Sequence, residues 1–228
     1  MTFGILIDIE GGDGAGKATQ TELLRKRLEE AGQRVTMFDF PRYYDSRVGR
    51  LIGELLSGKH GDFMVMPAQV TSLPYMLDRA AAKSDILAAL TDGGIAICNR
   101  YTPSNLAHQS AKVPKDEQAA LVELIEGIEY GDLGVPQPDT VMYLAVPTDI
   151  SSDLIAKKSK RDYLGDEHGG RDLAERNITH QDRARAAYVR LAAEKSWHVV
   201  ECATGGALRT PEDIHTEIWE IVQARLAR

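Results

Sequence analysis

The stretch GGDGAGKATQ, residues 11–20, follows the apolar run FGILIDIE of residues 3–10 and precedes a segment with leucines at helical spacing. Gly11, four intervening residues, Gly16 and Lys17 form the pattern of a phosphate-binding loop, in the strand-to-helix context that this pattern requires. The glycines let successive backbone N–H groups turn toward phosphate oxygens, and the helix N-terminus adds partial positive charge. The stretch therefore predicts an α/β protein that binds a nucleotide, with Lys17 reaching the transferring phosphate.

One position of the loop departs from the pattern. Ala18 stands where a Ser or Thr commonly ligates magnesium, and Thr19 cannot replace it because the next residue along a helix points about 100° away. Asp13 would repel bound phosphates unless it binds a magnesium ion or a sugar hydroxyl; a turn-stabilising contact is the alternative. The loop thus raises the question of whether the protein is a working phosphoryl-transfer enzyme.

The composition excludes several classes of protein. The 228-residue chain has 43% apolar residues and a formal net charge of −7, which argues against a general nucleic-acid binder. No apolar run approaches the roughly 18 residues of a membrane span, and the N-terminus lacks signal-peptide features. Cys98 and Cys202 are expected to be buried thiols, and the six histidines show no metal-binding spacing. We expect a cytoplasmic protein with no nucleic-acid or membrane partner.

Apolar, β-rich runs alternate with helical patterns along the chain. The pattern predicts strands at residues 3–10, 34–40, 94–100, 140–146 and 197–203. It predicts helices at residues 19–31, 48–57, 67–90, 115–127, 178–194 and 211–228. Strands rich in Val and Ile between helices predict a five-stranded parallel sheet with helices on both faces, the three-layer P-loop NTPase-type α/β fold, in a single domain of residues 1–228. Ligands of such a sheet bind at the C-terminal ends of its strands.

The segment at about residues 155–177 differs from the rest because it is polar and strongly basic. Its basic residues are Lys157, Lys158, Lys160, Arg161, Arg171 and Arg176, with glycines at 165, 169 and 170. We interpret this segment as a lid over the site. A solvated basic loop without function is the alternative.

Five motifs extend the observation beyond the loop: GGDGAGKATQ, FPRY at residues 40–43, YMLDR at 75–79, NRYTPSN at 99–105 and RDLAERN at 171–177. In this order and at these intervals they resemble the thymidylate kinases, which transfer the γ-phosphoryl group of ATP to dTMP. The resemblance spans residues 3 to about 222. It implies conversion of dTMP to dTDP for dTTP biosynthesis, with ATP as donor and Mg²⁺ as cofactor.

The resemblance also implies the residues of the site. The ATP-binding positions are Gly11, Gly12, Asp13, Gly14, Ala15, Gly16, Lys17, Ala18 and Thr19. The dTMP-binding positions are Asp13, Phe40, Pro41, Arg42, Tyr43, Tyr75, Arg79, Arg100, Asn105 and His108. Arg100 would grip the acceptor phosphate with its guanidinium fork, and Tyr75 would stack on the thymine ring. Arg79 would donate to the thymine O4 carbonyl and disfavour cytosine, with Asn105 at the N3 edge.

The implied catalytic residues are Lys17, Arg100, Lys160 and Arg161. Some family members carry an arginine in the loop where Gly14 stands here, so the basic lid would supply the transition-state charge, with Arg171 as the next candidate. Asp13 and Glu175 would provide carboxylates for Mg²⁺, which needs few protein ligands because phosphates and waters complete its shell. Ala18 then indicates a relocated magnesium site and not a lost activity.

Other positions leave alternatives open. Asn99 replaces an aspartate that usually precedes the arginine, and His108 stands where an aromatic ring often blocks the ribose 2′ position. Asp78 is a candidate to hold the neighbouring Arg79 guanidinium in place. Family members usually pair through helices, so apolar positions at residues 65–77 could serve a homodimer or the monomer core. The rival functions are a kinase for another nucleoside monophosphate and a regulatory protein that binds nucleotides without turnover.

Overall fold

The computed structural model describes residues 4–147, 150 and 173–227. Most of the predicted lid lies outside these residues, including Lys160, Arg161 and Arg171. Glu175 belongs to a short described helix, but its side chain lies outside the described part.

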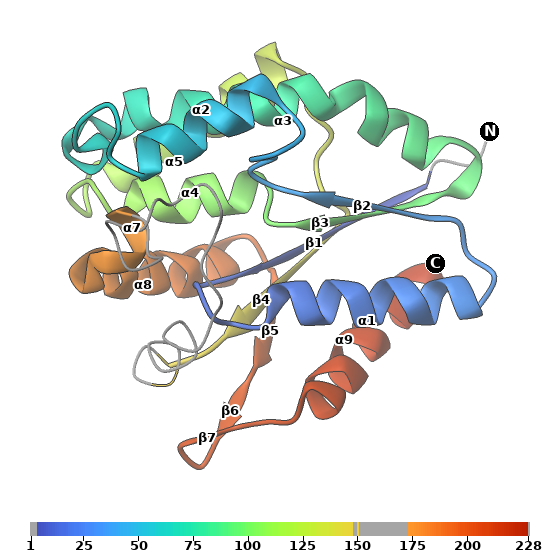
Figure 1. Ribbon diagram of the computed structural model, residues 1–228. Coiled ribbons are helices and arrows are strands. Elements are labelled where there is room, and N and C mark those ends of the chain that lie inside the picture. Colours follow the sequence, from blue (N-terminus) through green and yellow to red (C-terminus); the bar gives the residue numbers. More distant parts are fainter. Residues whose placement is uncertain (1–3, 148–149, 151–172, 228) are drawn as a thin grey trace.

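The centre of the molecule is a five-stranded parallel sheet (Figure 1). Its strands are β1 (Ile5–Gly11), β2 (Val35–Asp39), β3 (Ile95–Asn99), β4 (Thr140–Ala145) and β5 (His198–Glu201), in the order β2-β3-β1-β4-β5. Strand β1 pairs with β3 and β4, so that Ile9 lies opposite Asn99 on one side and Met142 on the other. The phosphate loop therefore leaves the middle of the sheet, and the predicted parallel architecture is confirmed.

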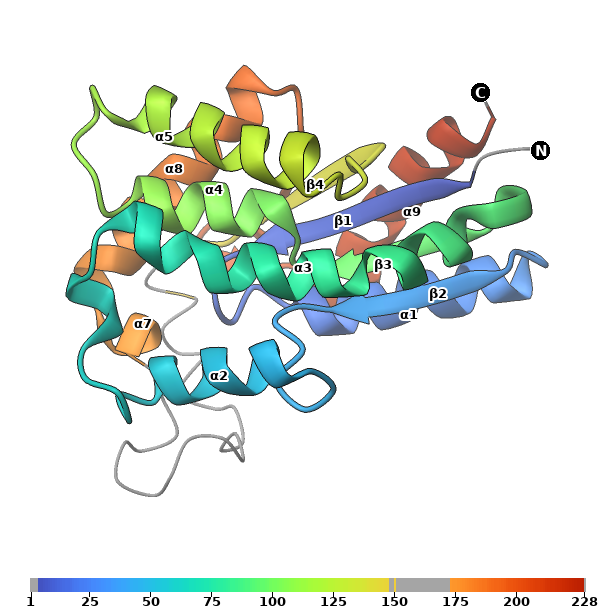
Figure 2. The same cartoon turned by 90° about the horizontal axis from the view of Figure 1, so that it is seen from above.

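Helices cover both faces of this sheet. They are α1 (Lys17–Glu30), α2 (Arg47–Leu56), α3 (Ala68–Leu90), α4 (Thr102–Ser110), α5 (Gln118–Glu126), α7 (Leu173–Arg176), α8 (Ile178–Glu194) and α9 (Pro211–Leu226), with short turns η1 (Phe63–Val65), η2 (Thr91–Gly93) and η3 (Gly127–Asp132). Helices α1 and α9 pack together below the sheet in Figure 1. Helices α3, α4 and α5 cover the opposite face and lie in front of the sheet in Figure 2. The three-layer prediction is thus confirmed.

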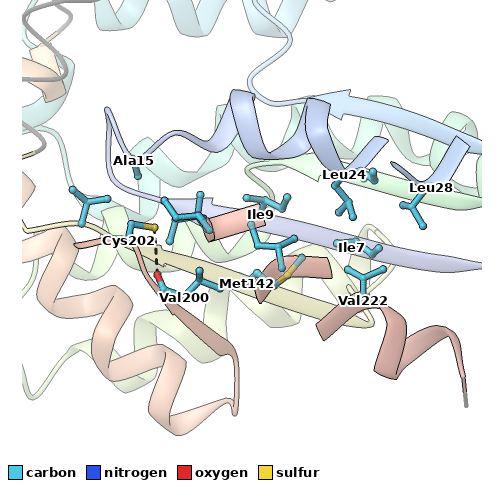
Figure 3. Packing of buried hydrophobic residues seen from close by; sticks show 14 of the residues in the cluster. Ile7, Ile9, Ala15, Leu24, Leu28, Met142, Val200, Cys202 and Val222 are labelled. Atoms are coloured by element: carbon cyan, nitrogen blue, oxygen red, sulfur yellow. Dashed lines mark hydrogen bonds between the residues drawn. The ribbon is translucent and has the colours of Figure 1, made fainter. Parts of the chain in front are cut away.

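Strand β1 divides its side chains between two environments because alternate residues of a strand point to opposite faces. Ile7 and Ile9 pack against α1 and α9 in the core shown in Figure 3, in contact with residues such as Leu24. Asp8 and Glu10 point to the other face and are fully buried there. Burial, reinforced by the adjacent Glu10, raises the pKa of Asp8 well above its usual range. Asp8 is therefore held as a neutral acid that can donate to the Glu10 carboxylate.

Two elements differ from the sequence prediction. Helix α4 was not predicted, because its start is rich in polar residues and contains Pro103. Beyond β5, the short strands β6 (Ala203–Thr204) and β7 (Ala207–Leu208) form an antiparallel hairpin that was also not predicted. The two cysteines are buried and free, as expected. Within the part of the chain that the structure describes, no helix is long and apolar enough to cross a membrane.

Candidate active site

A cavity of about 420 Å³ lies at the C-terminal ends of β1, β2 and β3. The predicted residues that line it are Asp13, Gly14, Ala15, Gly16, Lys17, Ala18, Thr19, Phe40, Pro41, Tyr43, Tyr75, Arg79, Arg100, Asn105 and His108. Among the described residues, Gly11, Gly12 and Arg42 were predicted for the site but do not line this cavity. The fold thus joins the phosphate loop and the base-binding candidates in one cavity.

The phosphate loop takes its shape from its glycines. Gly16 is the N-cap of α1 and has φ of 84°, a left-handed conformation that a residue without a Cβ adopts without strain. Helix α1 begins at Lys17, so its first N–H groups and its positive dipole end meet the cavity. The Lys17 ammonium donates to the carbonyls of Gly11 at 3.0 Å and Gly12 at 2.8 Å. The loop is therefore built to bind an anion.

Arg100 lies opposite the loop at the end of β3. Its φ of 67° is unusual for a residue with a side chain, and such conformations concentrate at functional sites. Its Nη2 donates to Asp13 Oδ1 at 2.5 Å. Burial acts against the charge of this guanidinium, but the Asp13 carboxylate outweighs it, and the pKa of Arg100 is raised. A fixed cation thus faces the phosphate loop.

The turn that carries Arg100 is fastened by Glu10, which the sequence analysis did not identify. The Glu10 carboxylate accepts the backbone N–H of Tyr101 at 2.8 Å and of Ser104 at 2.9 Å. It also accepts the hydroxyls of Ser104 and Tyr188. Because the N-cap residue of α4 makes no side-chain cap, this carboxylate from β1 satisfies the helix N-terminus in its place. A carboxylate inside an apolar strand was the available signal.

The opposite end of the cavity holds a buried ion pair. Arg79 of α3 donates from Nε and Nη2 to the two carboxylate oxygens of Glu129, at 2.6 and 2.5 Å. Burial acts to lower the pKa of Arg79, but Glu129 outweighs this effect and the pKa is raised. Glu129 was missed because it lies 50 residues from Arg79, in no recognised motif.

Asp78 does not hold Arg79, contrary to the sequence interpretation. Its carboxylate accepts the backbone N–H of Arg42 at 2.8 Å, the Nε of Arg42 at 3.2 Å and the Ser46 hydroxyl at 2.6 Å. The reason is geometric, since neighbouring residues of a helix point about 100° apart. Asp78 therefore anchors the turn after β2, and Arg42 is occupied on that side of the cavity.

Two stacked histidines border the cavity between its two ends. His108 of α4 and His180 of α8 have ring centroids 5.5 Å apart, with Nδ1 of His108 3.3 Å from Nε2 of His180. Arg100 can only donate, so its 3.5 Å contact makes Nε2 of His108 an acceptor. Burial, followed by the charge of Arg100, lowers the pKa of His108, and burial, followed by Lys112, lowers that of His180 to about 4. Both rings are neutral near pH 7.

Asn99 is paired with a carboxylate that the sequence analysis did not identify. Its Nδ2 donates to Oδ1 of Asp39 at 2.8 Å, and both residues line the cavity. Asp39 lies directly opposite Asn99 in the β2–β3 register. The acid missing at position 99 is therefore supplied at the same edge of the sheet by the neighbouring strand.

The donor set fits a magnesium ion that is held mainly by its nucleotide. Among the described residues, no group of three or more His, Cys, Asp or Glu side chains could hold a metal ion. Asp13 does bring a carboxylate to the cavity beside Lys17. Because Mg²⁺ keeps several waters and uses one or two carboxylates plus substrate phosphates, this arrangement suits Mg²⁺ better than a caged metal.

A parallel sheet that carries a phosphate loop on its central strand, with a second cation and a buried base-sized cavity opposite, defines a P-loop nucleotide kinase. The thymidylate kinase family model matches residues 9–218, which is most of the chain. The chain therefore belongs to the thymidylate kinase family.

Individual relatives agree with this assignment. A thymidylate kinase of Mycobacterium tuberculosis is 35% identical over 190 residues, which cover 83% of this chain and 86% of the relative. One of Synechococcus is 29% identical over 223 residues, covering 97% and 96% of the two chains. The solved thymidylate kinase structure of Candida albicans superposes with a TM-score of 0.75 at 21% identity, covering 98% of this chain and 92% of that one, and so supports the fold.

Proposed function

We propose that this protein transfers the γ-phosphoryl group of ATP to dTMP and releases dTDP and ADP. The observation that carries the proposal is the single cavity, which extends from the phosphate loop to a buried donor–acceptor pair formed by Arg79 and Asn105. A nucleoside monophosphate has its phosphate and its base at opposite ends, as this cavity requires. The family assignment adds the phosphotransferase class.

The proposed division of roles follows the geometry. Lys17 and the start of α1 bind the ATP phosphates, and Arg100 exchanges its contact with Asp13 for the acceptor phosphate. Tyr75 and Phe40 give the base an aromatic environment. Because the transferring group carries its charge on three oxygens, positioned cations supply most of the catalysis and no covalent enzyme intermediate is needed.

Three further parts of the proposal concern groups that the structure does not describe. The lid at about residues 155–177 supplies Lys160 and Arg161 to the transferring phosphoryl group. Asp13 and Glu175 hold the Mg²⁺ of the nucleotide. When bound, this ion neutralises charge on the phosphates and orients them for in-line transfer. The chain acts as one domain of residues 1–228 in the cytoplasm.

A homodimer is also part of the proposal. Helix α3 buries Ala68 and Met76 but exposes Val70, Leu73 and Leu77, at helical spacing. An apolar stripe of this kind suits a second copy of the same surface. Size-exclusion chromatography of wild type and of Leu73→Glu tests this point, with a monomeric variant as the expected result.

The decisive experiment measures ADP release from ATP and magnesium with dTMP, dUMP, dCMP or dGMP as acceptor, beside Lys17→Ala. We expect turnover that needs dTMP and is lost in the variant. Preference for another monophosphate would replace dTMP as the substrate. Calorimetric binding of dTMP without turnover would instead identify a regulatory nucleotide-binding protein.

A further inference from the structure

Glu129, in the η3 turn, is a buried carboxylate that faces the cavity only through other residues. It is fully buried and accepts hydrogen bonds from three side chains on two helices. Besides the two from Arg79, Thr102 donates at 2.9 Å and Asn105 Nδ2 donates at 3.1 Å. One carboxylate thus connects α3 and α4 at the base-binding end of the cavity.

The ion pair fixes the Arg79 guanidinium in one orientation. A bidentate contact uses Nε and Nη2 on one edge of the planar fork. The remaining Nη1 group is then the part of Arg79 that can donate into the cavity, which this residue lines. Glu129 therefore determines where the cavity has a hydrogen-bond donor.

The same carboxylate fixes the Asn105 amide. Its two N–H groups are used, one by Glu129 and the other by the Ser72 carbonyl at 3.3 Å. Turning the amide over would place its oxygen against two acceptors, which is unfavourable in a buried site. Its Oδ1 is buried and has no hydrogen-bond partner among the described residues, on a side chain that is 3% exposed and lines the cavity. The cavity therefore has a fixed acceptor near the Arg79 donor.

We propose that Glu129 is the positioning residue that sets the base specificity of this enzyme. By orienting Arg79 and Asn105 together, it presents a donor beside an acceptor. A ring with a carbonyl next to an N–H, as in O4 and N3 of thymine or uracil, complements this pair. Cytosine presents an amino donor next to a bare nitrogen acceptor and opposes it at both points. The inference rests on the proposed function, since it takes the base to occupy this end.

The test compares Glu129→Gln with wild type. Glutamine keeps the size but loses the charge, and its amide group would face donors of Arg79, Thr102 and Asn105. We expect KM for dTMP to rise, KM for ATP to stay unchanged, and the dTMP over dCMP ratio of kcat/KM to fall by about 10- to 100-fold. A purely structural role would not separate the two KM values.

Glu126→Gln is the matched control. It lies one turn earlier, pairs with Lys195 at 2.7 Å and does not line the active-site cavity. It should retain the wild-type ratio. Glu129→Asp keeps the charge while withdrawing the carboxylate by one methylene, so it remains informative if Glu129→Gln does not fold. We expect a ratio between those of wild type and Glu129→Gln, about 10-fold below wild type.

The outcomes separate this inference from the proposed function. Binding of dTMP and dCMP is measured by calorimetry beside turnover. A folded Glu129→Gln or Glu129→Asp enzyme with the wild-type ratio and the wild-type KM for dTMP overturns the role of Glu129. Wild type that binds dTMP without turnover overturns only the kinase activity, because the binding ratio still tests Glu129. Wild type that binds no dTMP overturns both.

Discussion

The two ends of the cavity are built differently. The phosphate end, formed by the loop with Asp13 and Lys17 and by Arg100, uses backbone conformation and ion pairs that a ligand can exchange. The base end, formed by Arg79, Asn105 and Glu129, is a completed network in which these side chains are at most 3% exposed. Phosphate-end residues should therefore control rate with little effect on stability. Base-end residues should control specificity and stability together.

Arg79→Met is expected to have the largest effect on stability. It leaves the Glu129 charge buried without its partner, which should lower the free energy of unfolding by about 3–5 kcal/mol. Urea unfolding measures this change. A loss below about 1 kcal/mol would show that the base end is less completely preorganised than its contacts indicate.

Lys17→Met should give the opposite pattern. The apolar stem remains, but the cation at the transferring phosphate is gone, so kcat should fall by about 10²- to 10³-fold. The free energy of unfolding should change by no more than about 0.5 kcal/mol, because the lost contacts are two carbonyl hydrogen bonds at a loop. A strong destabilisation would remove the contrast between the two ends.

The histidine pair between the ends predicts a dependence of stability on pH. The groups facing it are Arg100, His180, Asp13 and Lys17 around His108, and Lys112, Asp13 and Arg183 around His180. Since the pKa of His180 falls to about 4 on folding, the unfolded chain binds more protons below about pH 6.5. Stability is therefore complete above that pH and is lost as the pH falls toward 4, by on the order of 2 kcal/mol for His180.

The matched variant for this effect is His180→Gln, which cannot titrate but retains an acceptor. Its unfolding free energy, measured from pH 7 to 4.5, should fall less steeply than that of wild type. Parallel curves would mean that His180 gains its proton in the folded state as easily as in the unfolded state.

The smallest predicted effect lies at the edge of the phosphate end. Asn99→Asp places a carboxylate directly opposite Asp39, in contact range of its present hydrogen bond. We expect a loss of about 0.5 kcal/mol at pH 7 that disappears near pH 3, where both acids are protonated. Equal losses at both pH values would point to lost hydrogen bonding in place of charge repulsion.

The sequence predicted the phosphate end better than the base end, and the reason is physical. The phosphate loop is local, so Gly16 and Lys17 carry their meaning in their spacing. The base end depends on Glu129, whose partners lie on other helices far away in the chain. Asp78 shows the same limit, because adjacency to Arg79 in sequence became separation on the helix. The resemblance of motifs identified Arg79 and Asn105, but nothing in the sequence marked what orients them.

The cap that Glu10 gives to α4 also affects the order in which the site assembles. A helix that begins with a side-chain cap of its own can form as soon as its own residues collapse. Helix α4 obtains its cap from β1, so its first turn gains this support only once β1 and β3 are side by side. Because such contacts join residues distant in the chain, they form late and slowly. We therefore expect α4 to mature after the central strands during folding, with low φ-values at Asn105 and His108.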